Sequence, residues 1–358
     1  MRLRLVGTTL AALAAVAVAA TAQARSGSTP TLAQLVGQHL LVRMQGSTPS
    51  ASFLRRIRAG EIGGVVLFQN NATPAHVPAL VAKLQAAARM GGQLPLVIAV
   101  DQEGGAIKRL PGPPTLAPRS MTTASVARAQ GLSTARYLRG LGINSDLAPV
   151  LDVPSSRSAF IYSRAFSTSP AAVASRGVSF ADGLLAGGVA PTAKHFPGLG
   201  RLSTSTDTAA QTVSASKAAL ASDVVPFKRA ISEHIPAIMV GTAVYPAYGD
   251  SLPAAVSPHV VTNLLRGALH FTGVTLSDDL DTAAVWGRIP PVQAAVQAVR
   301  VGIDMVYIAG VNGSGGDAIG ERAYAALLHA ATDGTLSRSA LDASYARIAA
   351  FKARYTTG

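Results

Sequence analysis

The sequence predicts a single (β/α)8 barrel of the TIM type. Short apolar runs recur along the chain without polar alternation, which is typical of parallel strands buried on both faces. Alanine-rich amphipathic stretches lie between these runs, as crossover helices would. Polar residues gather where several runs end, which is where a barrel carries its active site. A doubly wound open sheet is the alternative that the same pattern allows.

The predicted elements follow one another in βα order. The predicted strands are 64–68, 94–101, 146–152, 189–195, 237–243, 274–278 and 305–308. Amphipathic helices are predicted over 75–89, 167–185, 216–233 and 290–301, among others. Neither an internal repeat nor an internal linker interrupts the series, so residues 32–358 are expected to form one domain.

The N-terminus has the pattern of a cleavable secretory signal. A basic start at 1–4 is followed by the apolar segment 5–20 and by an A-x-A site at 22–24. We expect residues 1–24 to be removed by cleavage after Ala24 and residues 25–31 to form a linker. The apolar segment is short for a membrane span, although an uncleaved anchor is the alternative. The mature chain is then exported, to the cell wall or the medium, without a membrane span.

Composition excludes several kinds of protein. Of the 358 residues 49% are hydrophobic, so a disordered polar chain is excluded. The absence of cysteine excludes disulfides, thiolate metal sites and cysteine nucleophiles. The seven histidines show no metal-ligand spacing, and the glycines of 310–316 lack the Gly-Lys-Ser/Thr of a phosphate loop. We therefore expect no metal and no cofactor.

The chain is strongly basic. Its formal charge of +13 falls to +11 when Arg2 and Arg4 leave with the signal segment. The sequence has no cluster of five or more Lys and Arg and only 5% aromatic residues, so nucleic acid is not expected as a partner. Diffuse positive charge on an exported protein instead fits attraction to anionic cell-wall polymers.

Ionisable residues stand at the ends of four predicted strands. They are Asp101 and Glu103, Asp152, Lys194 and His195, and Asp278 and Asp279. In a barrel the loops that follow the strands converge on one mouth, so these side chains are expected to lie together. Because the whole chain has only 18 acidic residues, this gathering indicates a site that works with carboxylates.

Residues 194–200, KHFPGLG, resemble the KHFPGxG motif of glycoside hydrolase family 3, and the wider chain is similar to the β-N-acetylhexosaminidase branch of that family. Further matching segments occur in family order: GGVVLF at 63–68, DQEGG at 101–105, LAPVLDV at 147–153, SRAF at 163–166, DVVPF at 223–227, VYP at 244–246 and GVTLSDDL at 273–280. The resemblance implies a barrel that hydrolyses terminal β-linked N-acetylglucosamine or a related β-hexosyl residue, for example in peptidoglycan fragments or chitin-derived sugars.

The resemblance also implies the two catalytic roles in part. A retaining glycosidase holds a carboxylate nucleophile ~5–5.5 Å from a proton donor. The family motif makes Asp278 the nucleophile, and Asp279 beside it a supporting residue. A strand end can hold a carboxylate rigidly against a sugar. The alternative for both residues is a structural one, capping the turn that follows.

The same resemblance implies a set of sugar-binding residues. The residues expected to contact the sugar are Asp101, Arg164, Lys194 and His195. Glu103 and Asp152 are expected to support them, with a pairing of Asp152 and Arg164 as an alternative. A histidine satisfied within the core is the other interpretation of His195. Gly104 and Gly105 are expected only to permit a tight loop after the strand.

The chain departs from the family pattern after residue 200. In the N-acetylhexosaminidase branch an Asp-Ser-His segment follows KHFPGxG, and its histidine is the acid/base. When the two are aligned without a gap, Ser205 stands at the position of the family's Asp and Asp207 at that of its His. When a two-residue insertion is allowed, Asp207 stands at the Asp position and Ala209 at the His position. Either way the histidine is missing.

Two functions follow from this departure. In the first, Asp207 is the acid/base, as a carboxylic acid kept protonated by burial or by Asp278 can be, in a retaining enzyme with a covalent intermediate on Asp278. In the second, the barrel is catalytically degenerate and binds cell-wall saccharide without efficient hydrolysis. We favour the enzyme, because the remaining sugar-binding set is present.

Overall fold

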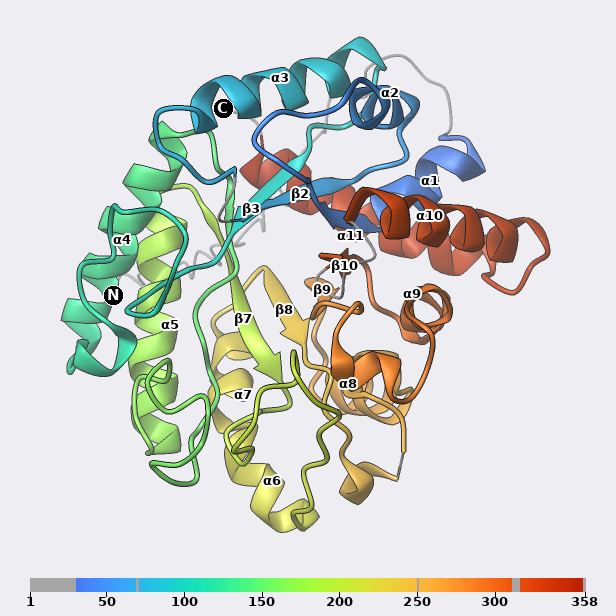
Figure 1. The fold of residues 1–358 in the computed structure, drawn as a ribbon. Coiled ribbons are helices and arrows are strands. Elements are labelled where there is room, and N and C mark those ends of the chain that lie inside the picture. The colour runs from blue at the N-terminus through green and yellow to red at the C-terminus, as the bar shows by residue number, and fades with distance from the viewer. Residues whose placement is uncertain (1–29, 69–70, 250, 311–315, 357–358) are drawn as a thin grey trace, which may run out of the picture.

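Eight parallel strands form the barrel around which the chain is built (Figure 1). The structure, a computed structural model, describes residues 30–68, 71–249, 251–310 and 316–356. The predicted signal segment 1–24 lies outside the described residues. The strand order is β10-β1-β2-β3-β6-β7-β8-β9, and a parallel bridge from Leu276 to Met305 joins the last strand to the first. The predicted TIM-type barrel is confirmed, and the open sheet is excluded.

The barrel strands are short, and a two-stranded hairpin stands on the mouth. The strands are β1 (Leu40–Arg43), β2 (Gly64–Leu67), β3 (Val97–Val100), β6 (Ser145–Asp146), β7 (Ala190–Phe196), β8 (Ala237–Val240), β9 (Val274–Ser277) and β10 (Val306–Ile308), with the hairpin β4 (Gln102–Gly104) and β5 (Ile107–Lys108). Short strands are expected here because a barrel strand only has to cross the sheet before its loop turns outward to the helix layer.

Helices surround the barrel on all sides (Figure 1). They are α1 (Leu32–Gln38), α2 (Ala51–Ala59), α3 (Val77–Met90), α4 (Ala124–Gly140), α5 (Pro170–Ala186), α6 (Lys217–Asp223), α7 (Val225–Ser232), α8 (Ala283–Trp286), α9 (Pro291–Val301), α10 (Gly316–Thr332) and α11 (Arg338–Tyr355). Three short 3-10 turns, η1 (Pro118–Ser120), η2 (Pro246–Tyr248) and η3 (Ala254–Val256), and a π-helix, η4 (His259–Ala268), complete the layer. Among the described helices none is both long and apolar enough to cross a bilayer.

Two predicted elements differ from the structure, and one observed strand was not predicted. The strand predicted over 146–152 is only β6, because Pro149 has no N–H to donate to a sheet. The helix predicted over 216–233 is two helices, and Pro226 lies in the first turn of the second, α7. The strand β1 was not among the predicted strands, because it contains a short apolar run, Leu40–Val42, followed by Arg43.

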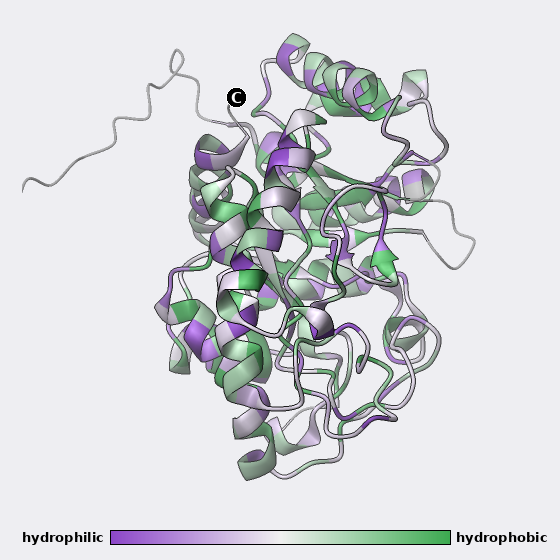
Figure 2. Ribbon diagram, turned by 90° about the vertical axis from the view of Figure 1, so that its left-hand side faces the viewer, coloured by the Kyte–Doolittle hydropathy of each residue, from purple (hydrophilic) through white to green (hydrophobic). Residues whose placement is uncertain are grey.

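Two apolar layers hold the fold together. One fills the barrel with side chains such as Leu41, Val66, Leu147 and Met239, and the other packs the helices against the outside of the strands. Figure 2 shows the corresponding hydrophobic colour along the strands at the centre of the molecule. Gly64 is required at the first position of β2, because a Cβ there would lie 2.7 Å from Leu41 Cδ1 and 2.8 Å from the carbonyl oxygen of Val97.

Candidate active site

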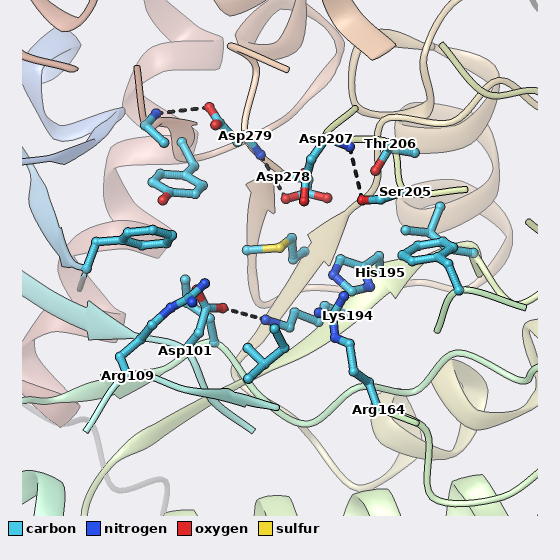
Figure 3. A pocket seen from close by; sticks show the side chains of 18 residues that line it. Asp101, Arg109, Arg164, Lys194, His195, Ser205, Thr206, Asp207, Asp278 and Asp279 are labelled. Atoms are coloured by element: carbon cyan, nitrogen blue, oxygen red, sulfur yellow. Dashed lines mark hydrogen bonds and ion pairs between the residues drawn. The ribbon is translucent and has the colours of Figure 1, made fainter. Parts of the chain in front are cut away.

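The loops at the carboxyl ends of the strands enclose a cavity of about 280 Å³. Seven of the nine predicted site residues line it: Asp101, Arg164, Lys194, His195, Asp207, Asp278 and Asp279 (Figure 3). The other two, Glu103 and Asp152, lie immediately behind this lining and contact it. The structure therefore brings all nine predicted residues to one site.

A network of ion pairs forms one wall of the cavity. Lys194 is buried at the end of β7, and its Nζ lies 2.6 Å from Asp101 Oδ1 and 2.7 Å from Glu103 Oε1. Arg164 holds both oxygens of Glu103, with Nε–Oε2 and Nη2–Oε1 distances of 2.9 and 2.6 Å. Two cations thus share two carboxylates, and the network fixes the side chains that face the cavity.

The network keeps its carboxylates ionised. Burial alone would raise the pKa of Glu103, but Arg164 and Lys194 outweigh it and lower that pKa to about 2. Burial is likewise outweighed at Asp101, whose pKa is lowered by Lys194 and Arg109. The pKa of Lys194 is raised, because the two carboxylates outweigh the effect of burial. Asp101 therefore presents a charged acceptor to a ligand, and Lys194 a charged donor.

Asp152 pairs with His195 and not with Arg164, so the alternative pairing is wrong. Its Oδ2 lies 2.7 Å from His195 Nδ1, while Oδ1 accepts the backbone N–H of Leu199 at 2.7 Å. Arg164 instead forms its ion pair with Glu103. The fully buried Asp152 carboxylate thereby orients the imidazole, which lines the cavity close enough to Asp278 to lower the pKa of that carboxyl.

Asp278 follows the last residue of β9 and is held through its backbone and its side chain. Its N–H donates to the carbonyl of Val240 at 2.8 Å, and its Oδ1 accepts the N–H of Asp279 at the same distance. Burial raises the pKa of Asp278, His195 partly offsets this, and the charge of Asp207 adds to it. A fixed carboxylate with one oxygen engaged can offer the other to an electrophile.

Asp279 ties the ends of two strands together. Its Oδ1 accepts the N–H of Ala309 after β10 at 2.9 Å and that of Asp281 at 3.0 Å. Burial, opposed by these two N–H groups and reinforced by Asp278, raises the pKa of Asp279 to about 8. Asp279 thus braces the segment that carries Asp278.

Asp207 reaches the cavity from the loop after β7, and its side chain points toward Asp278 (Figure 3). Burial was one of the two effects through which the sequence allowed Asp207 to act as an acid, and it is absent because Asp207 is exposed; the other, the neighbouring Asp278, is present. The loop is nonetheless attached, since Thr206 is buried and the carbonyls of Thr206 and Asp207 accept the N–H groups of Ala284 and Ala283 at 3.2 and 3.3 Å. The site therefore contains two facing carboxylates of different exposure.

Arg109 is a site residue that the sequence reasoning missed. The hairpin β4–β5 returns the chain to the mouth through Gly104 and Gly105, whose φ values of +98° and +62° confirm the predicted tight loop. Arg109 then lies with its Nη2 3.3 Å from Asp101 Oδ2 and its guanidinium 4.0 Å from the ring centroid of Phe68. The sequence feature that could have predicted Arg109 is the Gly104-Gly105 pair, because a hairpin at these two residues brings Arg109 back to Asp101.

These groups suit one kind of chemistry. Charged donors and acceptors surround a small cavity, as recognition of a polyhydroxylated ligand requires, and two carboxylates face each other beside it. Among the residues that the structure describes, no group of three or more His, Asp or Glu side chains could hold a metal ion. A barrel with this arrangement has the site of a carboxylate-dependent glycosidase.

Comparison with known proteins agrees with the site. Residues 31–351 match the glycosyl hydrolase family 3 N terminal domain, and the chain belongs to that family of glycosidases. A secreted glycosyl hydrolase of Arthroderma benhamiae is 33% identical over 335 residues, which are 90% of this chain and 94% of that protein.

Two solved structures share the fold and the sequence similarity. A family 3 β-N-acetylglucosaminidase from a Paenibacillus species matches 91% of this chain and 63% of its own, with 33% identity and a TM-score of 0.85. A β-N-acetylhexosaminidase from Beutenbergia cavernae matches 91% of this chain and all of its own, with 32% identity and a TM-score of 0.82.

Proposed function

We propose that this protein is an exported retaining glycosidase that removes terminal β-linked N-acetylglucosamine, or a related β-hexosyl residue, through a covalent intermediate on Asp278. The observation that carries the proposal is the pair of carboxylates, Asp207 and Asp278, facing each other at a cavity lined by Asp101 and Lys194 (Figure 3). The two solved relatives described above are named for N-acetylglucosamine or N-acetylhexosamine substrates, which supports this sugar.

The reaction takes place in two displacements. In the first, the Asp278 carboxylate attacks the anomeric carbon, the glycosidic C–O bond breaks, and protonated Asp207 gives its proton to the leaving oxygen. In the second, ionised Asp207 takes a proton from water, the water oxygen attacks the anomeric carbon, and Asp278 leaves as a carboxylate. The configuration at that carbon is retained.

The cavity supports attack on the end of a chain. Its volume of about 280 Å³ is small for a ligand site, which favours one sugar ring over a longer segment. Asp101 accepts hydrogen bonds from the hydroxyls of that sugar, while Lys194, Arg109 and Arg164 donate to them. The β-linked disaccharides of peptidoglycan fragments carry such a terminal sugar.

Release of p-nitrophenol tests the activity. Turnover of the β-N-acetylglucosaminide with little or no turnover of the β-glucoside is the expected result. Turnover of neither, with sugar binding intact in calorimetry, would contradict the enzyme proposal. It would favour the second function, a barrel that binds wall saccharide without efficient hydrolysis.

That second function is favoured by one observation: Asp207, the carboxylate that would have to replace the missing acid/base histidine, is exposed. Asp207→Asn and Asp278→Asn separate the two functions. A hydrolase loses activity in both variants, whereas a binding module retains its attachment to wall saccharide in both.

The basic surplus supports an anionic cell-wall polymer as a partner. Between residues 44 and 145 the sequence has three acidic residues, of which Asp101 and Glu103 belong to the site and Glu61 pairs with Arg56. Exposed cations lie on the successive helices α2, α3 and α4: Arg55, Arg58, Lys83, Arg89, Arg128, Arg136 and Arg139. We call this surface the basic face.

Helix dipoles account for only part of the basic face. Cations in the last helical turn complement the dipole, as Arg58, Arg89 and Arg139 do. Dipole complementarity would also place acids in the first turns of α2, α3 and α4, and none is there. Arg89 and Arg139 line a groove of about 520 Å³ between α3 and the end of α4. An extended phosphate- or carboxylate-bearing wall polymer fits this charge, and duplex DNA is the competitor in the binding test.

Export is supported by the signal pattern at 1–24 and by the secreted relative from Arthroderma benhamiae. Mass spectrometry of the protein recovered from culture medium or cell wall tests it. We expect a mature N-terminus at Arg25, and an intact N-terminus on a membrane-bound protein would contradict cleavage.

A further inference from the structure

Trp286 is the only tryptophan of the sequence, and it is 49% exposed. Large aromatic side chains are usually mostly buried, because each removes a large apolar area from water. Exposure of Trp286 does not come with freedom of movement. Its indole Nε1 donates to Oδ1 of the buried Asp281 at 2.8 Å, so the ring is held in a fixed orientation.

The ring lies next to the loop that carries Asp207. Trp286 ends α8, whose first two N–H groups, those of Ala283 and Ala284, hold the carbonyls of Asp207 and Thr206. Further along, a Cβ on Gly287 would lie 3.3 Å from Ala210 Cβ. The loop residues beside α8, namely Ser205, Thr206 and Asp207, line the cavity. Trp286 is therefore fixed at the rim of the mouth, one helical turn from the Asp207 loop.

The proposed reaction determines which part of the substrate lies next to the Asp207 loop. An acid/base must reach the glycosidic oxygen, so the leaving group lies next to Asp207. The cavity of about 280 Å³ is filled by the terminal sugar, so the next sugar lies outside it, against the rim. A pyranose ring has an apolar face of C–H groups that packs well on a flat aromatic surface.

We propose that Trp286 is the platform on which the leaving-group sugar stacks, so that the substrate is a β-linked disaccharide or longer saccharide and not merely a terminal sugar on any alcohol. This inference rests on the proposed function, because the platform serves the same cavity. It assigns Trp286 to binding of the second sugar and leaves proton transfer to Asp207.

Paired substrates test the platform. With N,N′-diacetylchitobiose, Trp286→Ala is expected to lower kcat/KM about tenfold, which corresponds to about 1.4 kcal/mol. With methyl β-N-acetylglucosaminide, which has no second sugar, kcat/KM stays within about twofold. Trp286→Phe keeps a flat ring and retains most of the disaccharide activity. Met90→Ala on α3 is the matched control, an exposed apolar side chain away from the mouth that leaves both substrates unaffected.

A purely structural role gives a different result. If Trp286 only braced α8 through Asp281, the alanine variant would loosen the Asp207 loop and slow both substrates equally, and Trp286→Phe, which lacks the indole N–H, would do the same. Equal losses on the two substrates would overturn the platform.

Intrinsic fluorescence gives a second readout that does not depend on turnover. Because Trp286 is the only tryptophan, all indole emission comes from it. In Asp278→Asn, N,N′-diacetylchitobiose is expected to shift the emission to shorter wavelength in a saturable way, and methyl β-N-acetylglucosaminide is not. An emission shift in Asp278→Asn without any hydrolysis by the wild type would support the Trp286 platform and contradict the proposed hydrolase activity. Hydrolysis by the wild type without an emission shift would contradict the platform and support the hydrolase activity. Failure to bind either sugar would contradict both.

Discussion

Replacing Glu103 by glutamine tests the ion network that builds the sugar-binding wall. Glutamine has the shape of a protonated glutamate, so the variant removes the charge and leaves the packing in place. Arg164 and Lys194 then lose a shared partner within 3 Å of their nitrogens, and both are largely withdrawn from water. Cations left in such a place are costly, because their hydration is not restored.

The magnitude follows from the pKa of Glu103. Its value of about 2 in the folded protein, against an ordinary 4.5, corresponds to ~3 kcal/mol of stability at neutral pH. A depressed carboxyl pKa stabilises the folded state above the unfolded pKa, and this contribution is lost as the pH falls through the folded pKa. At pH 3 the carboxyl is almost fully protonated in the unfolded state but still mostly ionised in the folded state, so ~1 kcal/mol of stabilisation remains.

Urea unfolding at the two pH values measures this directly. The free energy of unfolding of the wild type is expected to exceed that of Glu103→Gln by ~3 kcal/mol at pH 7 and by ~1 kcal/mol at pH 3, with equal m values for the two proteins. Arg338→Gln is a suitable control, because its exposed pair with Asp342 contributes little at either pH. A difference that is the same at pH 7 and pH 3 would refute the electrostatic origin.

Three further predictions concern the acid/base, the basic face and the core. Asp207→Asn is expected to lower kcat on the disaccharide by ~10²–10⁴-fold and to move the acid limb of kcat/KM to lower pH, because the Asp207 charge helps to raise the pKa of Asp278. An unmoved limb in the pH profile would contradict this coupling. Arg89→Glu with Arg139→Glu should weaken retention on teichoic-acid-bearing walls in a salt-dependent way, with p-nitrophenol release unchanged; tighter binding to duplex DNA than to walls would contradict the partner. Burial lowers the pKa of Lys352 to about 7, so wild-type stability should rise between about pH 7 and 10, and Lys352→Met should flatten that rise in unfolding titrations; an equal slope in both proteins would show that Lys352 is not its source.

The sequence was sufficient to predict the barrel and the position of the site. Buried parallel strands have apolar runs on both faces, and the barrel topology brings the strand ends together whatever the loops do. Asp101, Lys194 and Asp278 follow directly from that rule, because each ends a strand or lies beside its end.

Pairings across the site could not be predicted in the same way. Asp152 and Glu103 were both available to Arg164, and only the three-dimensional arrangement decides that Glu103 takes Arg164 and Asp152 takes His195. Arg109 was missed because it reaches the site by a hairpin and not from a strand end. The burial of a loop residue also depends on which distant segments pack against it. The exposure of Asp207 could therefore not be predicted from the sequence.

The covalent intermediate on Asp278 is the central claim, and trapping it is the most direct test. A 5-fluoro glycosyl fluoride of N-acetylglucosamine slows the second displacement more than the first, so a glycosyl-enzyme accumulates and can be digested and mapped by mass spectrometry. We predict one added sugar on the peptide that contains Asp278, and none in Asp278→Asn. A sugar attached at another residue, or rapid turnover of the reagent to a product of inverted configuration, would contradict the nucleophile and the retaining mechanism.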